Sequence, residues 1–196
     1  MQRLHPRGLL LAGAVALSLG FAAVAQAQST GSETERNVDQ QQRIEQGLQS
    51  GQLTSGESRK LEQGEARIDR TEQRDLANGS LSASEKAQIQ REQNHESAAI
   101  YHQKHDAQTG NPDSLKSNLA QANVQRDVNQ EQRIHNGVAN GSLTNREVGH
   151  LQGREAHVDH MEAHSDTLRQ TGRIQRADNR DSRRIYRQKH DSQRRH

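Results

Sequence analysis

The residues best suited to chemistry are four histidines that lie close together in the second half of the chain. They are His150, His157, His160 and His164, and their spacing places them on one side of a helix. Two imidazoles one helical turn apart, His157 with His160 or His160 with His164, can chelate Zn²⁺, Cu²⁺ or Ni²⁺. His157 and His164 would lie about 10 Å apart along the axis, so a third ligand would have to come from another helix or another copy.

Two other interpretations of these histidines stay open. Basic residues that flank an apolar seam are usually solvated or paired with acids, and the corresponding positions in the first half of the chain are Lys60, Arg67, Arg70 and Arg74. A histidine cluster can also form an interface that changes near pH 6.

The phrase Ile-Tyr-x-Gln-Lys-His-Asp occurs twice, at 100–106 and 185–191. As a structural element, its Lys and His would complement the dipole at a helix end while its Ile packs inward. As a functional element, it would offer a protein partner two contact pairs, Tyr101 with His105 and Tyr186 with His190.

The C-terminal segment is strongly basic and is a candidate for binding an anionic polymer or surface. Residues 169–195 contain ten Arg or Lys against Asp178, Asp181 and Asp191. Tyr186 is their only aromatic residue, which argues against a nucleic-acid partner. Self-association is the alternative, because residues 28–113 carry 10 basic and 15 acidic side chains and residues 114–196 carry 15 and 10.

The sequence offers no catalytic constellation. It has no cysteine and no nucleophile, zinc-protease or phosphate-loop motif. We therefore expect a protein that is not an enzyme, and the sequence assigns it no definite cofactor.

A short turn phrase, Gly-x-Leu-Thr/Ser-x-x-Glu, positions the helices and begins at Gly51, Gly79 and Gly141. Glycine can end one helix in the left-handed conformation, and the Thr or Ser with the Glu can form a capping box for the next. The phrase resembles the second half of a calcium-binding EF-hand loop. The opening ligand positions carry no carboxylate, which argues against Ca²⁺.

The chain contains an internal duplication. Residues 36–74 and 126–164 align without gaps over 39 positions, of which 16 are identical. We expect repeat one at 35–108, acidic, with helices near 35–49, 55–77 and 83–105. A linker at 109–117 would lead to repeat two at 118–196, basic and histidine-rich, in which the last two helices could join because the turn near Ser165 is short.

The apolar residues recur with a helical period, as Leu151 and Val158 do. The predicted fold is all-α, with two duplicated units of antiparallel helical hairpins. With no Trp, two Tyr and one Phe in the chain, a thick globular core is excluded.

Residues 1–27 have the features of a signal peptide: Arg3 and Arg7, an apolar run at 8–24, and Ala25-Gln26-Ala27 for cleavage. We expect a periplasmic or secreted protein with a short disordered tail at 28–34 and no transmembrane span after cleavage. An uncleaved anchor is the alternative, because the apolar run is nearly long enough to cross a bilayer.

Two phrases together carry a resemblance to a known family. They are Ile-x-x-Gly-x-x-x-Gly-x-Leu-Thr-x-x-Glu at 44–57 and 134–147, and Ile-Tyr-x-x-Lys-His-Asp at 100–106 and 185–191. They resemble an uncharacterised family of small exported proteobacterial helical proteins. The resemblance implies export and a helical fold and lends no mechanism. We expect a non-enzymatic helical protein that acts by binding or as a stress-related accessory factor.

Overall fold

The computed structural model describes residues 19–164 and 168–193, and these ranges contain helices and no strand. The prediction of an all-α fold is confirmed. The helices of the described ranges are α1 (Leu19–Ser50), α2 (Ser55–Asp75), α3 (Ala83–Lys104), α4 (Leu115–Ala139), α5 (Asn145–Ala163) and α6 (Leu168–Lys189), and a single 3₁₀ turn, η1 (Leu76–Asn78), follows α2.

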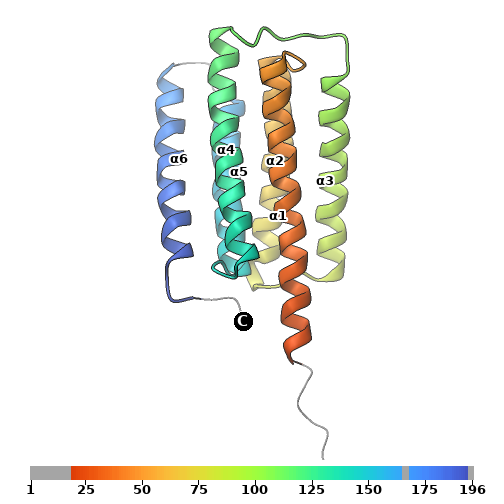
Figure 1. The fold of residues 1–196 in the computed structure, drawn as a ribbon, viewed down its shortest axis with the longest axis vertical. Helices are drawn as coiled ribbons and strands as arrows, with labels where there is room; N and C mark the ends of the chain where they lie inside the picture. The colour runs from red at the N-terminus through yellow and green to blue at the C-terminus, as the bar shows by residue number, and fades with distance from the viewer. Residues whose placement is uncertain (1–18, 165–167, 194–196) are drawn as a thin grey trace, which may run out of the picture.

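The chain forms two three-helix units, α1–α2–α3 and α4–α5–α6, that pack on each other (Figure 1). The principal contacts between the units join α1 to α4 and α2 to α5. The third helices, α3 and α6, lie at opposite edges of the molecule (Figure 1). The middle of the bundle is therefore lined by α1, α2, α4 and α5.

Each turn phrase fixes the end of one helix and the start of the next. Gly51 and Gly141 take φ values of 74° and 72°, which a residue with a side chain adopts only with strain. Thr54 accepts a hydrogen bond from the backbone of Glu57, whose side chain bonds back to Thr54. The carboxylate of Glu57 is therefore occupied in a capping box, and Glu85 and Glu147 cap their helices in the same way.

The leucine of the turn phrase packs against a glycine six residues earlier, in the last part of the preceding helix. Leu53 is fully buried, and a Cβ atom added to Gly47 would come within 2.6 Å of its side chain. Leu143 has the same relation to Gly137, at 2.5 Å. This contact explains the spacing Gly-x-x-x-Gly-x-Leu, because the first glycine leaves the space that the leucine fills.

Two apolar clusters occupy the two ends of the bundle, and each combines residues from both units. The cluster beside the Gly51 turn contains Ile44, Leu48, Leu53, Leu61, Ile100, Val124 and Val128. The cluster beside the Gly79 and Gly141 turns contains Leu76, Leu81, Ile89, Ile134, Val138, Leu143, Val148, Leu151 and Ile185. The middle of the bundle, between these clusters, holds polar residues.

The structure differs from the expected segment boundaries in two places. The expected tail at 28–34 is part of α1, because Thr30, Glu33 and Thr34 are buried and Thr30 Oγ1 donates to Asn145 Oδ1 at 3.0 Å. The second unit begins before residue 118, since Ser114 caps a helix that starts at Leu115.

In repeat two, α5 and α6 are separate helices that pack side by side rather than one long helix. The short turn near Ser165 lies outside the described residues, as do residues 1–18 of the expected signal peptide, whose last residues, from Leu19, begin α1. Within the described part of the chain, no helix is both long enough and apolar enough to cross a membrane.

Candidate cation site in the bundle interior

Acidic residues face inward from α2 and α5 at helical spacing. On α2 they are Glu62, Glu65, Asp69 and Glu72, and on α5 they are Glu155, Asp159 and Glu162. Steps of three and four residues place each set on one side of its helix, and the two helices pack against each other. All seven residues are buried. Carboxylates therefore occupy positions where a helical bundle usually carries aliphatic side chains.

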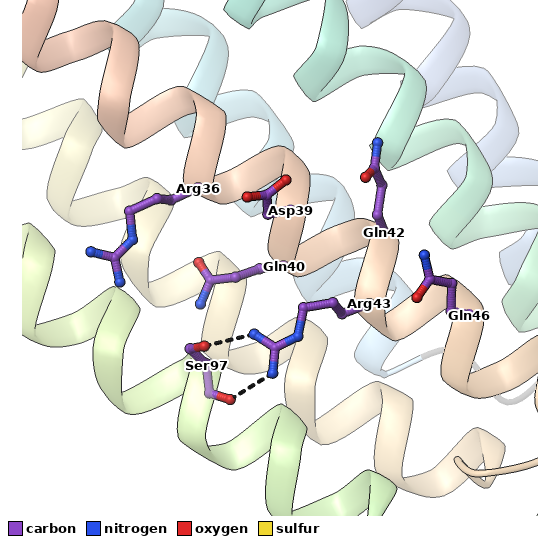
Figure 2. A pocket seen from close by; sticks show the side chains of 7 residues that line it. All are labelled: Arg36, Asp39, Gln40, Gln42, Arg43, Gln46 and Ser97. Atoms are coloured by element: carbon purple, nitrogen blue, oxygen red, sulfur yellow. Dashed lines mark hydrogen bonds between the residues drawn. The ribbon is translucent and has the colours of Figure 1, made fainter.

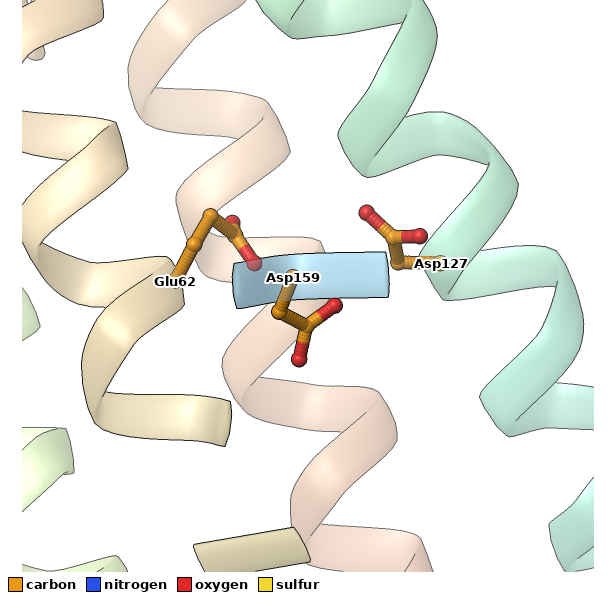
Figure 3. Close-up of side chains that lie close together, drawn as sticks. All are labelled: Glu62, Asp127 and Asp159. Atoms are coloured by element: carbon orange, nitrogen blue, oxygen red, sulfur yellow. The ribbon is translucent and has the colours of Figure 1, made fainter. Parts of the chain in front are cut away.

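Five of the buried acids form the interior carboxylate cluster: Glu62, Asp127, Asp159, Glu162 and Asp178. Oxygen atoms of Glu62, Asp127 and Asp159 lie within 4.8 Å of one another, and so do oxygen atoms of Asp127, Glu162 and Asp178. Figure 3 shows the first trio, with carboxylates converging from α2, α4 and α5. Asp127 belongs to both trios, so its carboxylate stands between two adjacent groups of ligands.

Two members of the cluster, Asp127 and Asp159, lack the hydrogen-bond donors that buried carboxylates require. Asp127 and Asp159 are 2% and 1% exposed, and none of their four carboxylate oxygens has a hydrogen-bond partner among the described residues. Arg126 supplies one positive charge, since its Nε donates to Asp178 Oδ2 at 2.6 Å. An unpaired buried charge is strongly unfavourable, so the remaining carboxylates need protons or a cation.

Burial dominates the electrostatics of the cluster. It raises the pKa of Glu62 to about 7, with a further rise from the neighbouring Glu96. Burial and adjacent carboxylates raise the pKa of Asp127, Asp159 and Glu162 well above their ordinary values. In the absence of a cation, these carboxyl groups hold protons at pH values where exposed acids are ionised.

The corresponding positions of repeat one are satisfied by amides. Asn37, Glu72 and Gln93 there correspond to Asp127, Glu162 and Asp178. Gln93 Nε2 donates to Asn37 Oδ1 at 2.7 Å, and Asn37 Nδ2 donates to both carboxylate oxygens of Glu72 at 3.2 Å. Repeat two replaces the two amides with carboxylates. This place in the fold therefore holds one acid and two amides in repeat one, and three acids in repeat two.

At the neighbouring pair of positions, each repeat pairs one amide with one acid. Gln41 on α1 donates to Glu62 on α2 at 3.1 Å. At the equivalent positions the roles are exchanged, and Gln152 on α5 donates to Glu131 on α4 at 3.2 Å. The trio at Asp127 departs from this matching, because it contains no amide.

The four predicted histidine ligands lie on the exposed side of α5, away from the carboxylates. His150, His157, His160 and His164 are all exposed. The structure brings two of them together: the rings of His160 and His164 stack with centroids 4.3 Å apart. Burial, and then the nearby His164, lower the pKa of His160. Among the described residues, no group of three metal ligands includes a histidine, so the Zn²⁺, Cu²⁺ or Ni²⁺ site stays a prediction.

The repeated Ile-Tyr-x-Gln-Lys-His-Asp phrase divides into buried and exposed positions. Ile100 and Ile185 are fully buried, whereas Tyr101 and Tyr186 are 55% and 59% exposed. Each tyrosine ring stacks on the histidine one turn later, Tyr101 on His105 and Tyr186 on His190, with centroids 4.1 Å apart. The exposed pairs are available for the predicted partner contacts, which remain a prediction.

Each phrase is held near the first helix of its own unit by hydrogen bonds. Lys104 Nζ donates to the carbonyl oxygen of Arg43 at 3.3 Å. The Arg43 guanidinium in turn donates to Ser97 Oγ and to the Ser97 carbonyl oxygen, beside a polar pocket of about 260 Å³ between α1 and α3 (Figure 2). Lys189 and Arg133 make the corresponding bonds to the carbonyl oxygens of Arg133 and Ser182 in repeat two.

The basic residues of α6 are separated from its acids. Asp178 and Asp181 are 2% exposed and face the bundle, where they pair with Arg126 and Arg154. Six arginines of the same helix are exposed: Arg173, Arg176, Arg180, Arg183, Arg184 and Arg187. The outer face of α6 is therefore more basic than the sequence count implies. Arg194 and Arg195 lie outside the described residues.

The interior carboxylates were not identified as a site by sequence reasoning, although the duplication contains a signal for them. Glu65, Asp69 and Glu72 are identical to Glu155, Asp159 and Glu162 in the repeat alignment. Acids retained at one helical spacing in two diverged copies indicate an inward-facing role. Comparison with known proteins adds nothing to this assignment: no protein family, no curated protein and no solved structure matches the chain.

Proposed function

We propose that this chain is an exported, non-enzymatic helical protein that binds hard divalent cations inside its bundle, at the interior carboxylate cluster. The observation that carries the proposal is the difference between the repeats. Asn37 and Gln93 donate hydrogen bonds in repeat one, and Asp127 and Asp178 replace them beside a third acid in repeat two. A cation supplies the positive charge that the added carboxylates need in place of the amide hydrogen bonds.

The chemistry of the ligands selects the class of ion. The cluster offers carboxylate oxygens and no nitrogen or sulfur ligand, which favours Ca²⁺, Mg²⁺ or Mn²⁺ over Zn²⁺, Cu²⁺ or Ni²⁺. Two divalent cations that share Asp127, together with Arg126, would neutralise the five carboxylates. Carboxylate-bridged ions in proteins lie about 3.5–4 Å apart, which matches two trios with a common member.

The surroundings of the cluster favour binding over catalysis. Its five members are between 1% and 5% exposed, so a substrate has no route to the ions. A cation held there would cross-link α2, α4, α5 and α6, and its binding free energy would add to the stability of the fold.

The first test removes the site by restoring the chemistry of repeat one. We expect calorimetric titration of the purified chain with Mn²⁺ or Ca²⁺ at pH 7.5 to show saturable binding of two ions. In the double variant Asp127→Asn, Asp178→Gln, the high-affinity binding should be lost while the helical content is kept, because the variant side chains reproduce the Asn37–Glu72–Gln93 hydrogen bonds.

The second test creates a site in the other repeat. The double variant Asn37→Asp, Gln93→Asp should gain cation binding in repeat one, since it places three acids where Glu72 now accepts amide bonds. Absence of saturable binding by the unmodified chain, with both ions, would overturn the proposal and leave the cluster as a set of protonated acids.

A second candidate function, binding of an anionic surface through α6, is favoured by one specific observation. The aspartates of the helix face inward and are paired, so its exposed arginines have no acid of α6 beside them on the outer face. We expect the chain to bind vesicles that contain anionic lipid and to lose this binding in Arg176→Gln, Arg180→Gln, Arg184→Gln. Equal binding to neutral vesicles would exclude this candidate.

A further inference from the structure

A groove between α2 and α3 concentrates positive charge in repeat one. It has a volume of about 500 Å³. Its basic side chains are Arg67, Arg70 and Arg74 from α2 and Arg91 and His95 from α3. The α2 arginines recur at steps of three and four residues, so they form one row along the groove.

Part of this charge is not paired with acids of the protein. Arg67 is 3.9 Å from Glu96, a long ion pair, and Arg74 is paired with the adjacent Asp75 at 2.7 Å. Arg70, Arg91 and His95 are exposed, and among the described residues none of them has a hydrogen bond or an ion pair. The four arginines are matched by Glu92 and Glu96 in the groove and by Asp75 beside Arg74, which leaves one excess positive charge.

The equivalent place in repeat two is filled by protein side chains. Gly64 corresponds to Arg154, and Glu96 corresponds to Asp181. Arg154 Nε donates to Asp181 there, so a guanidinium occupies the space between the second and third helices. In repeat one Gly64 has no side chain, and the end of the Glu96 side chain lies where a Cβ atom would be, so Glu96 would have to move to admit a larger residue. The groove is therefore open in repeat one because Gly64 replaces an arginine.

The row of α2 arginines also differs from its counterpart. Arg67, Arg70 and Arg74 correspond to His157, His160 and His164. Guanidinium groups remain charged at all physiological pH values and present paired donors that fit phosphate oxygens. Repeat one thus has three guanidinium groups at the place where repeat two has three imidazoles.

We infer that the groove between α2 and α3 binds a small phosphorylated anion. Arg67 and Arg74 are about 10 Å apart along the helix axis, which suits a ligand with two linked phosphate groups better than a single phosphate. Gln88 and Glu92 line the opposite wall and are joined by a hydrogen bond of 2.9 Å. This wall suits hydroxyl groups of the ligand, as in a phosphorylated sugar or nucleoside.

Inorganic pyrophosphate is the probe for this inference. Calorimetric titration of the full chain at pH 6.5, in buffer freed of divalent cations, should show saturable binding at one site. Inorganic phosphate should bind at least tenfold more weakly, because it spans only part of the row. No saturable binding of pyrophosphate would overturn the inference.

Matched variants distinguish binding of pyrophosphate in the groove from its non-specific attraction to exposed basic residues. Arg70→Gln with Arg91→Gln should weaken pyrophosphate binding at least tenfold, and Gly64→Arg should do the same by filling the groove as Arg154 fills its counterpart. Arg183→Gln with Arg187→Gln removes two exposed arginines of α6 and should leave binding unchanged. An equal loss in the α6 variant would contradict a site in the groove. Circular dichroism melts establish that each variant is folded. If Gly64→Arg does not fold, the double variant Arg70→Gln, Arg91→Gln decides the outcome.

Discussion

At the scale of single residues, Arg126 shows how strongly the interior depends on charge. It is partly exposed, and its guanidinium pairs with Asp178, whose side chain is 3% exposed. Its counterpart in repeat one, Arg36, donates to the neutral Asn94 instead. The same arginine therefore neutralises a buried charge in one repeat and makes a surface hydrogen bond in the other.

This difference gives a matched pair of substitutions. Arg126→Gln should lower the free energy of unfolding by about 3 kcal/mol, because it leaves the carboxylate of Asp178 buried and unpaired. Arg36→Gln should change it by about 0.5 kcal/mol or less. Urea unfolding at pH 7 measures both, and similar values for the two variants would show that Asp178 does not depend on Arg126.

At the scale of helices and turns, the leucine of the turn phrase is a main anchor of each unit. Leu53 is fully buried against Gly47, whereas Leu115, in the first turn of α4, is 69% exposed. Leu53→Ala should therefore destabilise the fold by about 2–5 kcal/mol, and Leu115→Ala by about 0.5 kcal/mol or less. Thermal unfolding followed by circular dichroism compares them. A small effect of Leu53→Ala would mean that the turn does not anchor the bundle.

The helical fold could be predicted because its signals are local. Glycine, a capping residue and a Glu three residues later mark the starts of α2, α3 and α5, and positions such as Leu61 and Ile68 repeat with a helical period. The boundary at 28–34 could not be predicted in this way. Those residues are polar and are helical because Thr30 contacts Asn145, a contact between residues far apart in the sequence.

The candidate site could not be predicted because acids are normally assigned to the solvent side of a helix. Asp127 and Asp159 are instead buried, and the partners that place them together come from different helices. The predicted histidines had the clearer pattern in sequence, yet they lie on the exposed side of α5. The fold shows that Asn37 and Asp127 occupy equivalent positions of the two repeats, with a neutral side chain in one and an acidic side chain in the other.

At the scale of the whole molecule, the two units share one interior and are expected to unfold together. Each of the two end clusters takes residues from both units, as when Leu76 of the first unit packs with Ile134 of the second. The acidic first half and the basic second half thus meet within a single chain. The carboxylates lie between the two apolar ends, so their charge state affects the entire bundle.

Stability without cations should therefore decrease as pH rises. Burial raises the pKa of Glu72 to about 8 and that of Glu131 to about 7, both above the ordinary value near 4.5. A raised pKa means that the folded state binds protons more tightly than the unfolded state, so this stabilisation is complete below about pH 4.5 and is lost as pH rises through 7 to 8. Urea unfolding in chelator at pH 5 and pH 8 measures the change. Greater stability at pH 8 would contradict the burial of these acids.

The most direct test of the cation proposal is a thermal melt of the full chain at pH 8, in chelator and with excess Mn²⁺ or Ca²⁺. At a free ion concentration of about 100 times the dissociation constant, binding to the folded state adds about 2.7 kcal/mol. For a chain of this size that corresponds to a rise in Tm of about 5–11 °C. We expect this rise in the unmodified chain and its absence in Asp127→Asn, Asp178→Gln. A Tm that is the same with and without the ions would contradict the central claim.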